Sequence, residues 1–177
     1  MTLLGYAAPS FDDPVGLLRA CHERILGHCE TLERLAEHLV RVGANSEARL
    51  AATRIRRYFH VAGPAHHADE ENQLFPWLLT QPDFPPMLRA AVRNLTAQHR
   101  ELEAAWRVLE ADLAAVERGE QPEALHLEPF ISMNRAHVAL ENGEIFPVAE
   151  KLLEEGAARR LGAAMAKRRA EEDCDLP

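Results

Sequence analysis

Histidine is the residue type in this chain with the most obvious chemical use, because nine of the 177 residues are histidines. Four of them fall on the apolar stripes of four predicted helices, one on each: His22, His66, His99 and His137. A single histidine on such a face is usually a hydrogen-bonded core residue, but burying four imidazoles costs free energy unless each finds a polar partner. One shared metal site would satisfy all four. The pattern therefore predicts a metal centre inside the protein.

Carboxylates at helical spacing strengthen this prediction. A glutamate follows three of the histidines by four residues: Glu70 after His66, Glu103 after His99 and Glu141 after His137. Residues four apart lie on the same helix face, one turn apart. Three inward carboxylates without an inward lysine or arginine require cations for neutralisation. Four nitrogens and three carboxylates exceed the needs of one tetrahedral zinc, and they fit two transition ions, iron or manganese, bridged by carboxylate.

Two neighbouring histidines compete for the ligand position on the second helix, since His67 also has a glutamate four residues later. An internal repeat separates them. Residues 66–76 align without gaps on residues 137–147, and histidine, alanine, glutamate, phenylalanine and proline recur at matching places. The repeat pairs His66 with His137, whereas His67 pairs with Val138. We therefore expect His66 to be the ligand and His67 to lie behind it, and His60 is a further candidate for orienting a ligand.

Four periodic segments carry these residues, with breaks at residues 43–46, 81–86 and 119–122. The first begins at Asp12–Pro14, where acidic residues and a proline suit a helix start. The second contains Gly63–Pro64, which predicts a kink or a new start; the last reaches about Glu155. The expected fold is an all-α, up-down-up-down four-helix bundle with its metal site in the core. Residues 1–155 form this domain, and 156–177 a short helical extension and polar tail.

The predicted inward stripes continue beyond the two glutamates that the repeat matches. On the second helix the stripe passes from Glu70 to Gln73 and Trp77. On the fourth helix it passes from Glu141 through Glu144 to Val148. Both predictions assume an uninterrupted α-helical period.

Composition and charge exclude several classes of function. The net charge of -8 argues against nucleic acid as a partner, since phosphate binding needs a basic face. No apolar run approaches the roughly 20 residues that span a bilayer, and residues 1–10 do not have the pattern of a signal peptide. Three cysteines without a CxxC pair suit a reducing compartment. We expect a cytoplasmic protein with no membrane contact.

The motifs together resemble those of hemerythrin-like proteins of the HHE cation-binding type, over residues 14–153. The segments that carry the resemblance are Cys21–Ile25, the HxxxE of His66–Glu70 with Leu74–Pro76, Gln98–Glu103, and the HxxxE of His137–Glu141 with Ile145–Pro147. The resemblance implies a four-helix bundle around two non-haem iron ions, oxo- or hydroxo-bridged, although other divalent metals fit the same donors. It places His22 and His66 on one iron and His99 and His137 on the other, bridged by Glu70 and Glu141.

The sequence departs from the oxygen-carrying members of the family at Glu103, where those proteins have a histidine. This departure puts reversible oxygen carriage in doubt, though not metal binding. On the sequence alone we expect Glu103 to face inward, to bind the iron of His99 and His137, and to favour its ferric state.

The resemblance favours a metal-binding protein that binds or responds to O₂, NO or peroxide over an enzyme with steady turnover. A diiron oxidase or peroxidase is the alternative from the enzyme class. A metal-stabilised regulatory or interaction module is the alternative from the binding class. The expected partner is a small diatomic ligand or peroxide, and the sequence names no protein partner.

Overall fold

The computed structural model describes residues 10–174, and within this range the protein consists of helices and connecting loops without a strand. The elements in chain order are α1 Pro14–Val42, α2 Ser46–Asp69, η1 Glu70–Leu74, α3 Phe75–Thr80, α4 Pro86–Glu117, α5 Phe130–Leu140, η2 Glu141–Ile145, α6 Phe146–Leu152 and α7 Glu155–Cys174. The segments η1 and η2 are single π-helical turns that continue α2 and α5. The all-α class predicted from the sequence is confirmed.

The helix ends follow the local signals in the sequence. The side chain of Asp13 accepts a hydrogen bond from the backbone N–H of Gly16 at 2.8 Å and caps α1. Gly43, at φ 84°, ends α1, because this left-handed conformation is accessible to glycine at little cost. Asn45 then caps α2 by accepting from Ala48 N–H at 3.0 Å. The first two helices are therefore joined by a tight, locally encoded turn.

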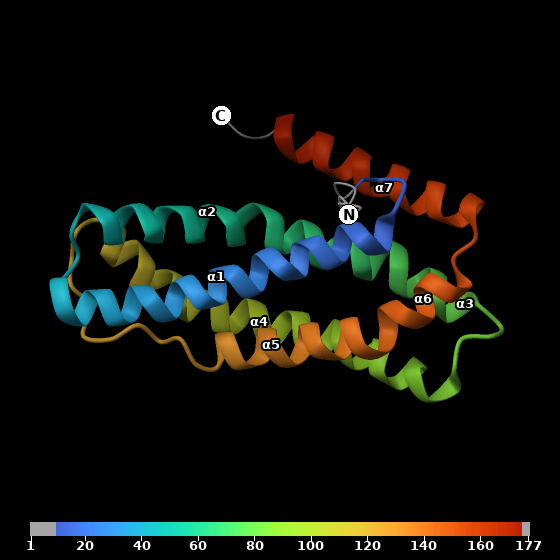
Figure 1. Cartoon of the computed structure of the whole chain (residues 1–177), viewed down its shortest axis with the longest axis horizontal. Helices are drawn as coiled ribbons and strands as arrows, with labels where there is room; N and C mark the ends of the chain where they lie inside the picture. The colour runs from blue at the N-terminus through green and yellow to red at the C-terminus, as the bar shows by residue number, and fades with distance from the viewer. Residues whose placement is uncertain (1–9, 175–177) are drawn as a thin grey trace, which may run out of the picture.

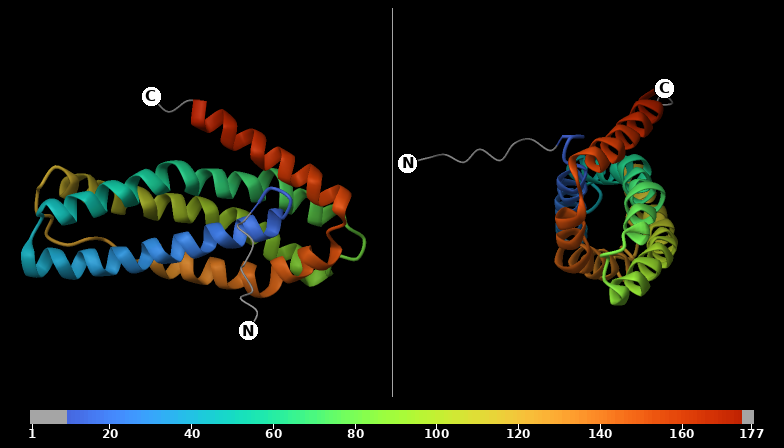
Figure 2. Two further views of the ribbon diagram at one scale, coloured as in Figure 1. Left: turned by 45° about the horizontal axis from the view of Figure 1, so that its top comes forward. Right: turned by 90° about the vertical axis from the view of Figure 1, so that its right-hand side faces the viewer.

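The long helices lie side by side around a common core (Figures 1 and 2). Helix α1 packs against α2 and α5, and α4 packs against the same two neighbours. Helix α7 lies across the outside, in contact with α1, α2 and η1. It has 20 residues and ends at Cys174, so the helical extension is longer than the short piece expected from the sequence. No helix within residues 10–174 combines the length and apolar character needed to cross a bilayer.

The apolar core falls into two halves along the bundle. One half surrounds Leu18, Leu95 and Phe146, and it includes Leu161 and Met165 of α7. The other surrounds Ile25, Trp106 and Phe130. On α1 and on α4, the histidine of the inward stripe lies between residues of the two halves. A polar layer therefore separates two apolar clusters.

The π-helical turns change the inward register that the sequence predicted. A π turn contains one residue more than an α turn, so every later side chain moves around the helix by about one position. From the end of η2 the buried residues are Ile145, Phe146 and Ala149, while Glu144 is exposed and Val148 is half-buried against the core. The predicted inward position of Glu144 is therefore wrong, and Val148 lies at the edge of the core.

The second helix shows the same shift. After η1 the fully buried side chains are Leu74 and Leu78, in place of the predicted Gln73 and Trp77. The α-helical pattern is interrupted at Glu70, where η1 begins. At Pro64, where the sequence suggested a kink or a new start, α2 continues without a new start.

Candidate metal centre

Six polar side chains meet in the layer between the two apolar halves, and each is at most 4% exposed. They come from all four long helical units: His22, His66, Glu70, His99, His137 and Glu141. All six are among the seven predicted site residues. Charged and imidazole groups are rarely buried without partners, so this layer requires a chemical explanation.

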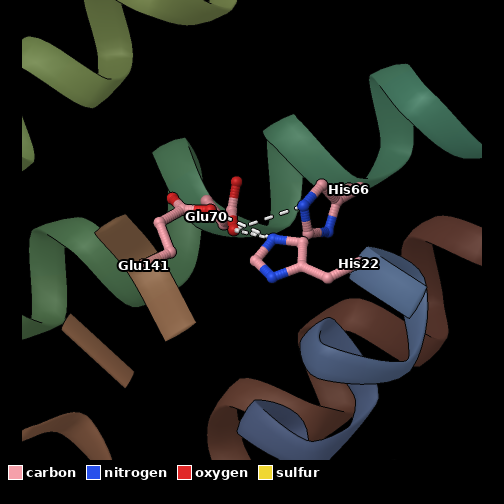
Figure 3. A group of neighbouring side chains, drawn as sticks. All are labelled: His22, His66, Glu70 and Glu141. Carbon is pink, nitrogen blue, oxygen red and sulfur yellow. Dashed lines mark ion pairs between the residues drawn. The ribbon is translucent and has the colours of Figure 1, made fainter. Parts of the chain in front are cut away.

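The six residues form two overlapping groups that share both glutamates. In each group one ligand atom from every residue lies within 4.8 Å of the others. The groups are His22, His66, Glu70 and Glu141, and Glu70, His99, His137 and Glu141. Figure 3 shows the first group, with both imidazoles directed toward the carboxylates. Each group offers two imidazole nitrogens and two carboxylates to a cation.

Each glutamate approaches one histidine of each group. Glu70 lies 3.4 Å from His66 Nε2 through Oε1 and 3.3 Å from His99 Nε2 through Oε2. Oε2 of Glu141 lies 3.0 Å from His22 Nε2 and 3.2 Å from His137 Nε2. Both carboxylates are thus placed between the two groups, as carboxylates that serve two neighbouring cations would be.

Three of the histidines are held from behind by hydrogen bonds at Nδ1. His22 Nδ1 donates to Asn142 Oδ1 at 2.9 Å, His99 Nδ1 to Glu71 Oε1 at 2.8 Å, and His137 Nδ1 to Gln98 Oε1 at 3.0 Å. A proton on Nδ1 leaves Nε2 as the atom with a free lone pair. Such outer hydrogen bonds fix the tautomer and ring orientation of metal-binding histidines.

The inner atoms of the cluster do not satisfy one another. Four carboxylate oxygens, His22 Nε2 and both nitrogens of His66 are buried without a hydrogen bond. The Nε2 atoms of His99 and His137 are 3.1 Å apart, although each ring already donates through Nδ1. Unsatisfied buried atoms of this kind cost free energy, and a cation between them would remove the cost. The donor set therefore fits a metal centre.

The protonation of the two glutamates differs in the metal-free cluster. Burial and the nearby Glu141 raise the pKa of Glu70 well above its ordinary value. Burial would also raise the pKa of Glu141, but the close approach of the His137 and His22 rings outweighs it and holds this pKa below its ordinary value. Protonation is therefore favoured at Glu70 over Glu141.

The pKa values of His66, His22 and His99 also differ from one another. Burial and repulsion from His22 hold the pKa of His66 well below its ordinary value, so this ring is neutral and ready to bind a metal. Burial would lower the pKa of His22, but the close Glu141 carboxylate and the charge of Glu70 raise it. Burial also lowers the pKa of His99.

The seventh predicted residue, Glu103, lies outside the cluster. Its side chain is 60% exposed and forms an ion pair with Arg107 on the same helix. The inward stripe of α4 passes from His99 to Leu102 and Trp106, so the position after Leu102 points to the rim of the bundle. The prediction that Glu103 faces inward beside His99 is therefore wrong.

The two other histidine candidates also lie outside both groups. The ring of His67 is half-buried and stacks on the ring of His99, with centroids 3.9 Å apart. Burial and the neighbouring His99 lower its pKa well below the ordinary value. His60 is exposed and lies 3.4 Å from Glu110 Oε1, away from the cluster histidines.

A small apolar pocket begins beside His67. It has a volume of about 60 Å³, and its apolar walls include Ile25, Phe59, Leu102, Trp106 and Phe130. His67 lies between this pocket and His99, so the pocket starts one ring away from the cluster. Pockets for organic ligands usually exceed about 300 Å³, so this space suits only a very small molecule.

Sequence reasoning did not identify the residues that support the cluster. Glu71 and Asn142 are equivalent in the internal repeat and directly follow the shared glutamates, which is a signal the sequence does contain. Asp69 was also missed. It is fully buried and forms ion pairs with Arg168 at 3.4 Å and Arg169 at 2.7 Å, so α7 is held to the helix that carries His66 and Glu70.

Comparison with known proteins agrees with this geometry. The hemerythrin HHE cation binding domain, as a family pattern, matches residues 13–149. An uncharacterized protein of Haemophilus influenzae is 28% identical over 162 residues, which cover 90% of this chain and 92% of that protein. The matched range includes all six buried polar residues of the cluster.

Proposed function

The chain belongs to the hemerythrin HHE cation-binding domain family, and from this premise we propose that it is a non-haem diiron protein that binds or responds to O₂, NO or peroxide. The observation that carries the proposal is the pair of buried four-residue groups that share Glu70 and Glu141. A single cation would use one group and leave the other with unsatisfied buried atoms. Two cations use every donor.

We assign the ligands residue by residue. His22 and His66 hold the first ion, His99 and His137 hold the second, and Glu70 and Glu141 contribute oxygens to both. This assignment is supported by the four nitrogen–oxygen distances of 3.0–3.4 Å across the cluster. It omits Glu103, because that side chain pairs with Arg107 at the surface.

Iron is the metal proposed, with other divalent ions as competitors for the same donors. A mixed set of imidazoles and carboxylates suits iron and manganese better than a soft metal. When bound, iron would supply electron exchange and an exchangeable coordination position. The chain itself holds three of the four imidazole rings in the binding tautomer, supplies compensating negative charge, and keeps both glutamates away from bulk water.

The apolar pocket beside His67 suits a small ligand. About 60 Å³ of mostly apolar space accommodates a diatomic molecule or peroxide. A peroxidase acting on peroxide itself would use the same space. Steady consumption of peroxide by the iron-loaded protein would identify such an enzyme.

A metal-stabilised regulatory module is a second candidate, favoured by the position of α7. This helix contacts α1, α2 and η1, and its arginines pair with Asp69, the residue before Glu70. Asp69 thus connects the residue next to it in the metal centre, Glu70, to α7 on the outside of the bundle. Unfolding on chelation without any reactivity toward O₂ or peroxide would favour this function.

The finer features of the fold and location belong to the same proposal. We infer that α1, α2 with α3, α4, and α5 with α6 form the up-down-up-down four-helix bundle of the family, with α7 outside. A cytoplasmic location is supported by the free thiols of Cys21 and Cys29, which are buried and unpaired with each other.

Metal analysis together with optical spectra tests the proposal. Protein loaded anaerobically with ferrous iron should contain two irons per chain, and after oxidation should show the near-ultraviolet absorption typical of a bridged ferric pair. Protein purified without added metal provides the comparison. One zinc per chain, with no capacity for a second ion, would contradict the diiron function.

A further inference from the structure

The residue that follows each shared glutamate accepts a hydrogen bond from a cluster histidine on another helix. Glu71, on η1, accepts from Nδ1 of His99 on α4 at 2.8 Å. Asn142, on η2, accepts from Nδ1 of His22 on α1 at 2.9 Å. The two residues are equivalent in the internal repeat, so the two halves of the cluster use the same construction.

The two supports nevertheless differ in charge. Glu71 presents a carboxylate to His99, whereas Asn142 presents a neutral amide oxygen to His22. The same amide oxygen also accepts from Arg19 Nη1 at 3.4 Å, so its electron density is shared with a cation. His137 is supported by the neutral amide of Gln98. Only the second group therefore has an anionic support among the described residues.

Other nearby charges reduce this difference without cancelling it. Arg19 also forms an ion pair with Glu150 at 2.9 Å, which neutralises part of its effect on the His22 side. Arg100 and Glu71 line the same surface groove, and Arg100 acts on His99 in the direction opposite to Glu71. Glu71 is in direct hydrogen-bond contact with the ring, so its influence on His99 is larger than that of Arg100.

A carboxylate behind a metal-binding histidine makes the imidazole a stronger electron donor. A stronger donor stabilises the more highly charged metal ion. The ring of His99 should therefore hold a ferric ion better than the ring of His22, although the two groups are otherwise alike in donor atoms.

We propose that Glu71 is a positioning residue that makes the two metal positions unequal, so that the ion held by His99 and His137 binds more tightly and is harder to reduce than the ion held by His22 and His66. This inference rests on the proposed function, since it requires two ions per chain. It goes beyond that function by assigning an order to the two positions and a cause for the order.

Glu71→Gln is the decisive variant, because glutamine keeps the hydrogen-bond acceptor but removes the charge. The matched control is Glu103→Gln, which removes an exposed carboxylate that pairs with Arg107 and belongs to neither ligand group. Metal-free protein is loaded anaerobically with two equivalents of Co(II), and release to a chelator is followed by absorbance. We expect two phases in the unmodified protein and in the control, and a slow phase about tenfold faster in Glu71→Gln.

Asn142→Asp provides the reciprocal test, since it gives the first position the anionic support that the second already has. It should slow the fast phase of Co(II) release and leave the slow phase unchanged. In iron-loaded protein, Glu71→Gln should raise the lower of the two reduction potentials. A tenfold loss of ferric over ferrous affinity corresponds to about 59 mV.

The outcomes separate the inference from the proposed function. Two bound ions with equal release rates, or unchanged rates and potentials in Glu71→Gln, would overturn the inference and leave the diiron function intact. Binding of fewer than two ions by the unmodified protein would overturn both. A purely structural role for Glu71 predicts no effect of glutamine, because the hydrogen bond is retained.

Discussion

Glu70 and Glu141 are equally buried and occupy equivalent places in the internal repeat, yet their pKa values move in opposite directions. Burial acts on both carboxyl groups, but the His137 and His22 rings beside Glu141 outweigh it, whereas Glu70 is influenced chiefly by its own burial and by the charge of Glu141. Protonation is therefore favoured at Glu70 over Glu141. Both carboxylates must be ionised to bind cations.

The choice between the adjacent histidines can be tested by alanine substitution. His66→Ala should reduce the bound metal from two ions per chain to one or none, because it removes a buried nitrogen of the first group. His67→Ala should leave two ions, since that ring stacks on His99 and belongs to neither group. Metal content after desalting measures both. Loss of metal in His67→Ala alone would reverse the assignment.

Glu103 was expected from the sequence to bind one iron and favour its ferric state, and its position in the structure changes that prediction. Glu103→Ala should leave the metal content and the rate of air oxidation of the reduced protein within about twofold of the unmodified protein, because the side chain pairs with Arg107 at the surface. Glu70→Gln is the positive control and should lower metal content strongly. Stopped-flow oxidation provides the rates, and a large change in Glu103→Ala would restore this residue to the centre.

At the scale of elements, the π turns and α7 have the largest consequences. Each π turn starts at a shared glutamate and moves the following apolar residues into register with the core. The same turns place Glu71 beside His99 of α4 and Asn142 beside His22 of α1. Helix α7 is joined to the bundle by the buried Asp69 and by Leu161 and Met165. Single π turns within α-helices, such as η1 and η2, are common at functional sites.

The close approach of α7 to the start of the chain can be tested at Gly162. A Cβ atom at this position would lie 1.7 Å from the backbone oxygen of Phe11, so Gly162→Ala must displace α7 or residue 11. The expected cost is about 1–3 kcal/mol of unfolding free energy. Gly156→Ala on the same helix is the control, since its nearest neighbour is the end of the Arg160 side chain at 3.6 Å. Urea denaturation compares the two, and equal midpoints would contradict this packing.

At the scale of the whole molecule, the polar layer divides the core into two apolar halves. Each half packs well by itself, but the layer between them contains buried atoms that lack hydrogen bonds. Folding without metal must therefore bear the cost of this layer, and metal binding becomes part of the folding free energy.

Removal of metal should destabilise the whole protein. We expect the melting temperature to fall by at least about 5 °C when a chelator removes the ions, since a ligand at 100 times its Kd contributes about 2.7 kcal/mol. Differential scanning calorimetry of loaded and chelated protein measures the difference. His66→Ala serves as the control, because its melting temperature should respond less to the chelator. Equal melting temperatures for the loaded and chelated unmodified protein would place the site outside the core.

The fold should also be sensitive to alkali. Burial raises the pKa of Cys29 from 9.0 to about 11, and burial raises the pKa values of Cys21 and Tyr58 as well. Between pH 9 and 11 the unfolded chain loses a proton from Cys29 that the folded protein keeps. The contribution is therefore fully present below pH 9 and is lost as the pH rises toward 11.

For Cys29 alone, the unfolding free energy lost between pH 9 and pH 11 is about 2–3 kcal/mol. Urea midpoints near pH 8 and pH 10.5 test the effect, and the decrease should be smaller in Cys29→Ala. A midpoint independent of pH in this range would contradict it.

The sequence alone determined the helical class, both ends of α1, the start of α2, and the six cluster residues, because each depends on local or periodic signals. Asp13, Gly43 and Asn45 act on their own backbone neighbours, and a buried stripe can be read directly from the period of 3.6 residues. The repeat also separated His66 from His67 correctly with respect to burial in the cluster.

Only the tertiary structure decided the orientation of Glu103, the register after each π turn, and the contacts of Glu71, Asn142 and Asp69. The spacing of four residues is the same for His66–Glu70 and His99–Glu103, but Leu102 occupies the inward position on α4. A π turn depends on packing on both sides of it, so the period of the sequence does not reveal it. The hydrogen bonds of Glu71 to His99 and of Asn142 to His22 join residues 28 and 120 positions apart in the sequence. Over such separations, the sequence around one residue does not identify its partner.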